Sequence, residues 1–289
     1  MKGVMKIDNI TSTNPVAVGD DVEFEIENEN DNTAMIDEIH QRNNYINRQS
    51  PRNKYQHHIV AANLDQSMLV ATLKEPKTSQ GFIDRFLVAS EMYHVKPFIV
   101  FNKSDLYKQK ELDKYEGWKA MYEAVGYKVF LVSAEKKEGV EEVLEMLKNK
   151  TTLISGHSGV GKSSFLNVVF PDKVLKTQEV SGWSGKGQHT TTFAEMFDLD
   201  FGGHIIDSPG IKTLGFSHLE IKDVSHNFKE FFVISKDCKF ANCKHINEPK
   251  CAVKDAVENE TIASFRYQNY LSIIDEIENQ NYWEIHDDV

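Results

Sequence analysis

One stretch of the sequence, residues 156–163, constrains the fold more than any other. It reads Gly-His-Ser-Gly-Val-Gly-Lys-Ser and fits the phosphate-binding loop pattern G-x-x-x-x-G-K-[ST]. An apolar run over residues 151–154 predicts a strand that enters the loop, and residues 164–169 predict a helix that leaves it. In this setting the glycines let backbone N–H groups wrap a phosphate at the positive end of the helix dipole. A glycine-rich turn that matches by chance would not need the flanking strand and helix, so we predict a nucleotide site.

The residues of this loop have separate expected roles. Lys162 would reach the β- and γ-phosphates and serve catalysis, and the Ser163 hydroxyl would ligate Mg²⁺. The residues expected to bind the nucleotide here are Gly156, His157, Ser158, Gly159, Val160, Gly161, Lys162, Ser163 and Ser164.

A second loop predicts which base the nucleotide carries. A buried strand over residues 97–101 ends in Asn102-Lys103-Ser104-Asp105, which fits the guanine motif N-K-x-D. The carboxylate of Asp105 would accept hydrogen bonds from N1–H and the exocyclic amine of guanine. Adenine lacks this donor pair and would leave the carboxylate unpaired, so an ATP-using enzyme is disfavoured. Asn102 would either contact the opposite edge of the base or tie this loop to the phosphate loop, and the stem of Lys103 would cover the ring.

A third loop follows the strand predicted over residues 127–132. It begins with Ser133-Ala134, where backbone N–H groups are expected to meet the guanine carbonyl oxygen. Because ligands of parallel sheets bind at the carboxyl ends of the strands, all three loops are expected at one edge.

Two switch segments are predicted after the phosphate loop. A strand over residues 203–206 runs into Asp207-Ser208-Pro209-Gly210, a D-x-x-G pattern. Asp207 would hold Mg²⁺ through water, and the Gly210 N–H would sense the γ-phosphate. The glycine-rich loop before it ends in Thr190, Thr191 and Thr192, one of which should close over Mg²⁺ and the γ-phosphate. We favour Thr191, although the sequence does not choose among the three.

Hydrolysis needs a water molecule aligned on the γ-phosphate. The position after D-x-x-G, where Ras-like enzymes carry a glutamine, holds Ile211, which cannot orient water by hydrogen bonding. We therefore predict that His189, beside the switch threonines, is the catalytic residue that positions the water. The alternative is that His189 contacts only RNA or solvent.

The motifs occur in a rotated order. A GTPase ordinarily runs from phosphate loop through both switches to the base loop and the Ser-Ala loop, whereas this chain begins with the base loop. Circular permutation preserves the contacts when the original ends lie close together. Alternating strands and helices over residues 63–217 therefore predict a circularly permuted α/β domain, with a mostly parallel sheet and helices on both faces. The second switch then leads directly into the C-terminal part.

Residues 1–62 are rich in predicted strands. Val22, Phe24 and Ile26 alternate with glutamates, which is typical of a half-buried strand, and residues 34–39 would return as its partner. Basic residues interleaved with aromatics follow and suit stacking and phosphate contacts on RNA, the alternative being a polar loop with buried tyrosines. These residues are Arg42, Tyr45, Arg48, Arg52, Lys54 and Tyr55. The module looks small for a five-stranded barrel, so an incomplete barrel is expected.

The three cysteines of the chain all lie within residues 238–251. Together with one histidine they provide a Cys₃His set that suits a closed tetrahedral structural zinc site, the alternative being buried cysteines without a ligand. The four expected ligands are Cys238, Cys243, His245 and Cys251. Residues 236–254 hold five lysines and two acidic residues, a net positive charge. This segment is predicted to face RNA, the alternative being an ordinary lysine-rich surface exposed to solvent. A final helix is expected to bury Ile262, Phe265, Leu271, Ile274 and Ile277.

Length and composition restrict the class of protein. A chain of 289 residues is expected to hold two or three domains. No apolar run approaches the about 20 residues that span a bilayer, and the N-terminus lacks a signal-peptide pattern, so a cytoplasmic location without a membrane partner is expected. The net charge of −11 argues against an indiscriminate nucleic-acid coat but allows local basic patches.

Taken in order, the motifs resemble one known family. NKSD, SA, GHSGVGKSS, HTTT and DSPG, followed by CKFANCKHINEPKCAVKDAV, are similar to the RsgA (YjeQ) family of small-ribosomal-subunit biogenesis GTPases. The resemblance covers nearly the whole chain, including residues 14–20. It implies an N-terminal OB-fold β-barrel (residues 1–62), a circularly permuted P-loop GTPase domain (63–217) and a C-terminal α-helical zinc-binding domain (218–289). Family members usually carry further residues before the segment that matches 4–18, so the first OB strands are expected to be missing.

The resemblance also implies a function. The family binds the small (30S) ribosomal subunit, acts in its late maturation, and hydrolyses GTP slowly until the subunit stimulates it. The implied ligands and partners are GTP or GDP with Mg²⁺, one structural Zn²⁺, and the subunit with its 16S rRNA, and a monomer is expected. It makes His189 the natural catalytic candidate. A nucleotide-gated RNA-binding assembly factor with vestigial hydrolysis is the main alternative. A GTPase of metal transport or tRNA modification is opposed by the lack of membrane segments and of a second catalytic motif.

Overall fold

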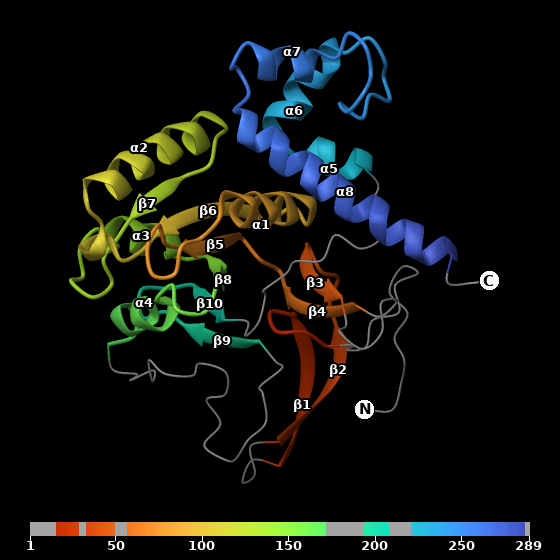
Figure 1. The fold of residues 1–289 in the computed structure, drawn as a ribbon. Coiled ribbons are helices and arrows are strands. Elements are labelled where there is room, and N and C mark those ends of the chain that lie inside the picture. Colours follow the sequence, from red (N-terminus) through yellow and green to blue (C-terminus); the bar gives the residue numbers. More distant parts are fainter. Residues whose placement is uncertain (1–15, 29–32, 50–56, 172–193, 208–220, 287–289) are drawn as a thin grey trace.

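The computed structural model describes residues 16–28, 33–49, 57–171, 194–207 and 221–286 (Figure 1). Two small sheets come first, a six-stranded sheet with helices on both faces follows, and helices form the C-terminal part. In these ranges no helix has both the length and the apolar character needed to cross a membrane.

The N-terminal strands form two separate antiparallel pairs. Strand β1 pairs with β2 in the predicted hairpin, and β3 pairs with β4. One parallel bridge, between Val18 and Ala61, ties the segment before β1 to β4. A closed five-stranded barrel is therefore not confirmed by the described strands. Their bounds are β1 (Val22–Asn28), β2 (Thr33–Ile39), β3 (Tyr45–Gln49) and β4 (His57–Ala62).

The burial predicted for β1 is wrong. Phe24 and Ile26 alternate with glutamates as expected, yet their side chains are 57% and 63% exposed. The reason is that β1 and β2 form a two-stranded ribbon, and no further described strand joins it. Alternation alone indicates which side chains share a face, but it does not supply the layer that would cover them.

Arg42 is one of the residues for which the sequence allowed RNA contacts or a polar loop, and its side chain is paired with Asp20. Its Nε and one terminal nitrogen donate to the two carboxylate oxygens at 2.6 and 2.7 Å, and the Ala17 N–H donates to the same carboxylate at 2.8 Å. The two side chains are 7% and 1% exposed. Such a bidentate pair fixes the turn before β1, so this charge serves the fold. Of the other basic and aromatic residues predicted there, Arg52, Lys54, Tyr55 and the side chain of Arg48 lie outside the described part.

The central sheet has the strand order β7-β6-β5-β8-β10-β9. The first five strands run parallel, as predicted, and β9 pairs antiparallel with β10 at one edge. Alternate residues of β5 serve different cores: Leu69 and Ala71 belong to one cluster, and Met68 and Val70 to the other. The strands are β5 (Gln66–Ala71), β6 (Lys96–Phe101), β7 (Val129–Leu131), β8 (Thr151–Ser155), β9 (Glu195–Asp198) and β10 (His204–Asp207).

Helices cover both faces of this sheet. Phe86 of α1 and Tyr122 of α2 pack in the first core, and Val143 of α3 and Phe165 of α4 pack in the second. A single 3₁₀ turn, η1 (Ser104–Leu106), follows β6. The bounds are α1 (Gln80–Met92), α2 (Gln109–Ala124), α3 (Val140–Leu147) and α4 (Lys162–Val169). The predicted α/β architecture is confirmed for the described residues.

The C-terminal part is helical, and its long helix α8 crosses α1 (Figure 1). Ile274 and Ile277 are buried on α8 as predicted, whereas Ile262 is buried in the connection that precedes the helix. The sequence pattern missed Arg266 and Tyr270, which are the most deeply buried large side chains of α8. The elements are α5 (Ile221–Asn227), α6 (Lys229–Ile234), η2 (Ser235–Asp237), α7 (Ala252–Glu258) and α8 (Ser264–His286).

A buried ion network fixes α8 on the nucleotide-binding part. Arg266 donates to Asp84 of α1 at 2.7 Å and to both oxygens of Glu230 of α6 at 2.7 and 2.9 Å. Asp84 also accepts from Tyr122 at 2.9 Å and from Asn269 at 2.5 Å. Burial opposes the charge on Arg266, but the two carboxylates outweigh it and raise the pKa of this guanidinium. The three helices are therefore joined by charges that water does not screen.

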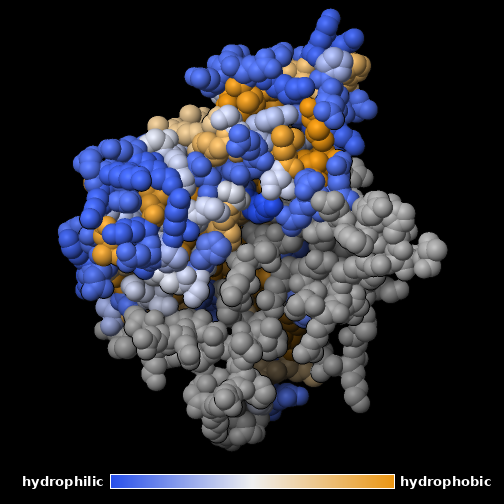
Figure 2. All heavy atoms as spheres, viewed as in Figure 1, coloured by the Kyte–Doolittle hydropathy of each residue, from blue (hydrophilic) through white to orange (hydrophobic). Residues whose placement is uncertain are grey.

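The surface of the C-terminal part combines apolar and basic side chains. Figure 2 shows hydrophobic surface over these helices, in contrast to the mostly hydrophilic surface over α2. Phe232, Val233 and Phe240 are large apolar side chains that are exposed there. Lys236 lies 5.6 Å from the ring centroid of Phe232, and Lys239 lies 5.2 Å from that of Phe240.

Candidate nucleotide site and metal centre

The phosphate loop joins β8 to α4, in the setting that the sequence predicts. Gly156 and Gly161 adopt φ angles of 151° and 90°, in the region that favours glycine. A Cβ on Gly156 would lie 2.3 Å from the carbonyl oxygen of Val70, and one on Gly161 would lie 2.4 Å from the amide nitrogen of Asn102. The loop is therefore packed tightly against β5 and the base loop, and only glycine fits at these two positions.

Lys162 of this loop and Asp207 at the end of β10 are close enough to affect each other's charge. The Lys162 ammonium donates to the carbonyl oxygens of Gly156 at 2.6 Å and His157 at 3.2 Å. Burial lowers the pKa of Lys162, and Asp207 works against this effect. Burial likewise raises the pKa of Asp207, and Lys162 works against it.

The surroundings of one Asp207 oxygen indicate whether the site fits Mg²⁺. This oxygen, Oδ1, is buried and has no hydrogen-bond partner among the described residues. A buried carboxylate oxygen of this kind is costly unless a cation or an ordered water satisfies it. The arrangement therefore fits a hydrated Mg²⁺ near Asp207 at the end of β10 and Ser163 at the start of α4.

Asn102 joins the three predicted loops. Its side chain is 1% exposed, and its amide nitrogen donates to the Val160 carbonyl oxygen at 3.0 Å. Its amide oxygen accepts from the Ala134 N–H at 3.0 Å. Of the two roles that the sequence left open for Asn102, the structure has the second, a tie between base loop and phosphate loop.

Asp105 lies next to the Ser-Ala loop. Its Oδ1 accepts a hydrogen bond from the Ser133 hydroxyl at 2.6 Å, which fixes the carboxylate. The Ser133 N–H donates to Glu138 at 3.0 Å, and the Ala134 N–H is taken by Asn102. Both N–H groups therefore bond within the protein here, and their contact with a guanine oxygen stays a prediction.

Lys103 bends toward the loop that follows β5. Its backbone is left-handed, with φ at 64°, and its ammonium donates to the Glu75 carbonyl oxygen at 2.5 Å. The stem of Lys103 also passes the phosphate loop, because a Cβ placed on Gly161 would lie 3.8 Å from the Lys103 Cε.

Two contacts of this site were not predicted. The Tyr107 hydroxyl donates to the Asn102 carbonyl oxygen at 2.7 Å and accepts from the Leu73 N–H at 2.9 Å, and burial raises the pKa of Tyr107 to about 12. The ring of Phe82 stacks on His157, with centroids 3.7 Å apart. Tyr107 lies only five residues from Asn102, but its other partner, Leu73, is 34 residues away, and Phe82 and His157 are also distant in the sequence, so no local pattern pointed to these contacts. The predicted Thr191, Thr190, Thr192, His189 and Gly210 lie outside the described residues.

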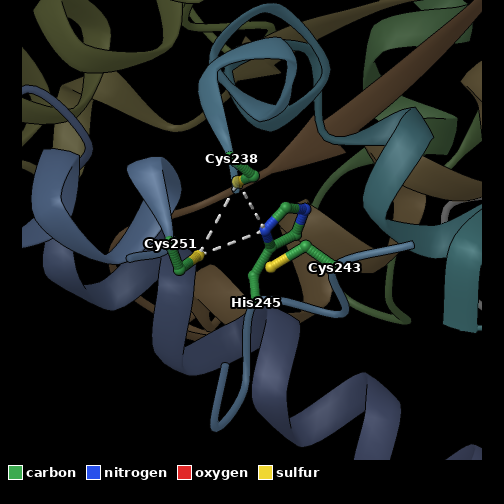
Figure 3. Close-up of side chains that lie close together, drawn as sticks. All are labelled: Cys238, Cys243, His245 and Cys251. Atoms are coloured by element: carbon green, nitrogen blue, oxygen red, sulfur yellow. Dashed lines mark hydrogen bonds between the residues drawn. The ribbon is translucent and has the colours of Figure 1, made fainter. Parts of the chain in front are cut away.

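The four predicted metal ligands converge in the C-terminal part (Figure 3). Their ligand atoms all lie within 4.8 Å of one another. The Nδ1 atom of His245 is 3.3 Å from the Cys251 sulfur and 3.7 Å from the Cys238 sulfur, and those two sulfurs are 4.0 Å apart. Ideal zinc bond lengths place tetrahedral donors about 3.6–3.8 Å apart. The geometry therefore fits a closed Cys₃His zinc site.

The chemistry of the donors supports the same fit. Burial lowers the pKa of His245, which keeps the imidazole neutral as a ligand must be. Burial raises the pKa of the Cys243 and Cys251 thiols, so gathering thiolates here requires a cation. From α8, Tyr267 donates to the His245 carbonyl oxygen at 2.7 Å and Tyr270 to that of Lys244 at 2.5 Å. The loop is thus held in position by the helix beneath it.

Removing a ligand is expected to release the metal. The full chain should purify with one zinc per molecule, and Cys251→Ser should lose it, because three donors cannot close the site. Zinc content by atomic absorption checks this result, with Lys236→Ala as a control that leaves all four ligands in place. Full zinc content in Cys251→Ser would contradict the assignment.

The family assignment follows from comparison with known proteins. A family model described as RsgA GTPase matches residues 39–217. Two curated relatives, from Flavobacterium psychrophilum and Phocaeicola vulgatus, are named small ribosomal subunit biogenesis GTPase RsgA. The first is 47% identical over 95% of this chain and 85% of its own length. The second is 47% identical over 98% of this chain and 90% of its own length.

Solved structures agree with this match. The crystal structure of YjeQ from Thermotoga maritima is 36% identical, with a TM-score of 0.73, over 91% of this chain and 84% of that one. YloQ, described as a circularly permuted GTPase, is 31% identical, with a TM-score of 0.72, over 96% of this chain and 85% of that one. This chain belongs to the RsgA GTPase family, and as a member it is a GTP hydrolase.

Proposed function

We propose that the chain, as a member of this family, acts on the small ribosomal subunit late in its assembly and hydrolyses GTP to GDP and phosphate with stimulation by the subunit. The names of its relatives support the ribosomal half of this proposal. The nucleotide half rests on one observation: Asn102 bonds at once to Val160 of the phosphate loop and to Ala134 of the Ser-Ala loop. Three loops that are separate in the sequence are thereby joined through one side chain.

Each of the three proposed domains would have its own function. Residues 63–217 would bind GTP, residues 218–289 would carry one structural zinc, and residues 1–62 would add RNA contacts as an OB-fold. The surface that runs from α6 into the zinc loop (residues 238–251) suits 16S rRNA because exposed Phe232 and Phe240 lie beside Lys236 and Lys239, a mix of stacking and cationic groups. The protein would act as a monomer on the subunit.

The described residues suggest how the site handles GTP. Lys162 would leave the carbonyl oxygens of Gly156 and His157, at 2.6 and 3.2 Å, and turn to the β- and γ-phosphates. This exchange puts the charge of Lys162 where negative charge develops during phosphoryl transfer. Bound Mg²⁺ would neutralise phosphate oxygens, with Ser163 and Thr191 as ligands and Asp207 reached through water. Gly210 would sense the γ-phosphate.

His189 is proposed to align the attacking water when the chain is bound to ribosomal RNA. His189→Ala should then keep GTP affinity but lose most of its subunit-stimulated turnover, by about 100-fold or more. Single-turnover hydrolysis with small subunits present measures this loss. A variant that keeps both nucleotide affinity and stimulated turnover would show that His189 contacts only RNA or solvent.

Asp105→Asn should remove the preference for guanine. The amide can no longer accept from both N1–H and the exocyclic amine, and it leaves one guanine donor unpaired. We expect GTP affinity to fall roughly 10- to 100-fold while ATP affinity stays weak. Titration with fluorescent nucleotides measures both, with Gln109→Ala on the nearby helix as the control. If Asp105→Asn kept the same ratio of GTP to ATP affinity, a residue other than Asp105 would have to recognise the base.

The proposal as a whole is tested by GTP turnover with and without purified small subunits. We expect a low rate for the chain alone and a clear rise with small subunits but not with large ones. A flat rate despite tight subunit binding would favour a nucleotide-gated assembly factor with vestigial hydrolysis. Absence of both binding and stimulation would overturn the ribosomal role.

A further inference from the structure

Helix α1 touches the phosphate loop with one residue and the C-terminal helix α8 with another. Phe82, in its first turn, stacks on His157 with centroids 3.7 Å apart and an interplanar angle of 32°. Two residues later, Asp84 accepts hydrogen bonds from Arg266 at 2.7 Å and Asn269 at 2.5 Å. The two contacts lie within three consecutive residues, so a shift of Phe82 is transmitted to Asp84 by the helix backbone itself.

The contact between α1 and α8 is stiff. Asp84 and Arg266 are 0% and 1% exposed, so separating them would leave an unpaired charge inside the protein. The backbone of α1 also lies close to α8 at Gly81, where a Cβ would lie 3.3 Å from the Asn269 side-chain oxygen. The two helices therefore move together or the network breaks.

From α8 the contacts continue to the zinc loop. Tyr267 and Tyr270 are the next residues along α8 after Arg266 that bind this loop, at the carbonyl oxygens of His245 and Lys244. Tyr270 is fully buried, and its ring lies in T-shaped contact with Phe231, 5.0 Å between centroids. A displacement of α8 therefore changes the support of a metal ligand.

We propose that His157 and Phe82 form a positioning contact that transmits nucleotide occupancy through α1 to α8 and the zinc loop. The reason lies in the hydrogen bonds of the phosphate loop. Its backbone carbonyl at His157 now holds the Lys162 ammonium at 3.2 Å, and phosphates would draw that ammonium away while fixing the loop around them. The backbone of His157 is therefore held by different bonds in the empty and the occupied site. We expect the position of the His157 ring, and with it that of Phe82, to differ between the two.

This route is separate from the switch that leads into the C-terminal part. The D-x-x-G switch responds to the γ-phosphate, which GDP lacks. The phosphate loop also holds the β-phosphate, which GDP carries. Comparison of the GDP-bound with the nucleotide-free protein therefore isolates the path through α1. The inference rests on the proposed nucleotide site.

Hydrogen exchange of the full chain with and without GDP tests the proposal. In the unmodified protein, GDP should slow amide exchange in residues 264–278 about fivefold or more, a typical coupling between sites. Phe82→Leu keeps an apolar side chain but removes the ring stack, so it should bind GDP and lose this slowing. Phe130→Leu makes the same chemical change in β7, away from the phosphate loop, and should keep it.

Each outcome decides the question. Undiminished slowing in Phe82→Leu would overturn the proposal, as would GDP binding to the unmodified chain without any slowing in α8. If calorimetry found no GDP binding to the unmodified chain, the nucleotide site would fail and this inference with it. Should Phe82→Leu not fold, His157→Gln removes the same ring contact from the loop side, and with GDP at a concentration that calorimetry shows to saturate this variant, it must lose the slowing as well.

Discussion

Lys162→Ala is expected to lower the rate of GTP hydrolysis by about 100- to 1,000-fold, the usual cost of losing a group that stabilises transition-state charge. The half-buried ammonium bonds to two carbonyl oxygens of the phosphate loop in the described structure, and Asp207 is a carboxylate that stabilises its charge. An alanine cannot supply charge to the phosphates, and water cannot easily replace it in a buried site. Phosphate release under saturating GTP measures the effect.

A matched control separates this effect from a general loss of positive charge. Lys148→Ala removes an exposed lysine that follows α3, and its rate should equal that of the unmodified chain. If Lys162→Ala retained more than about a tenth of the rate, the loop would bind nucleotide without using Lys162 in the chemistry.

Arg266→Met is expected to destabilise the fold by about 3–5 kcal/mol, because it leaves the carboxylates of Asp84 and Glu230 without their buried partner. The methionine fills much of the volume, so the loss comes mainly from unpaired charge. Urea unfolding followed by circular dichroism measures the change in the free energy of unfolding.

A compensated variant tests that explanation. In Asp84→Asn/Glu230→Gln/Arg266→Met the charges disappear together, and most of the lost stability should return, because no unpaired charge is left in the interior. If the triple variant were as unstable as Arg266→Met alone, packing of the guanidinium and not its charge would hold α8 in place.

Patterns that are local in the sequence predicted the fold well. The phosphate loop needs glycine at fixed spacing between a strand and a helix, so residues 156–163 identify both the loop and its neighbours. The same holds for the apolar runs of β5, β6 and β8, which are buried on both faces and therefore read as continuous hydrophobic stretches. The Cys₃His set was predictable because the short connections between its members limit how far apart they can lie.

Features that depend on distant partners were not predictable. Arg42 and Arg266 look like surface or RNA-facing charges until their partners are known, and Asp84 lies 182 residues from Arg266 in the chain. The sequence did not decide whether Asn102 bonds to the guanine base or to the phosphate loop, because either partner would satisfy the hydrogen-bonding groups of its side-chain amide. The exposure of Phe24 and Ile26 likewise depends on which element covers a sheet face, and periodicity does not contain that information.

The central claim is that the base loop, the Ser-Ala loop and the phosphate loop form one guanine-nucleotide site in a permuted domain. The most direct test is the dissociation constant of the intact chain for GDP and for ADP, measured by calorimetry in the presence of Mg²⁺. We expect GDP to bind at least about 100-fold more tightly, because only guanine offers Asp105 its two donors. Equal affinities for GDP and ADP would contradict the claim.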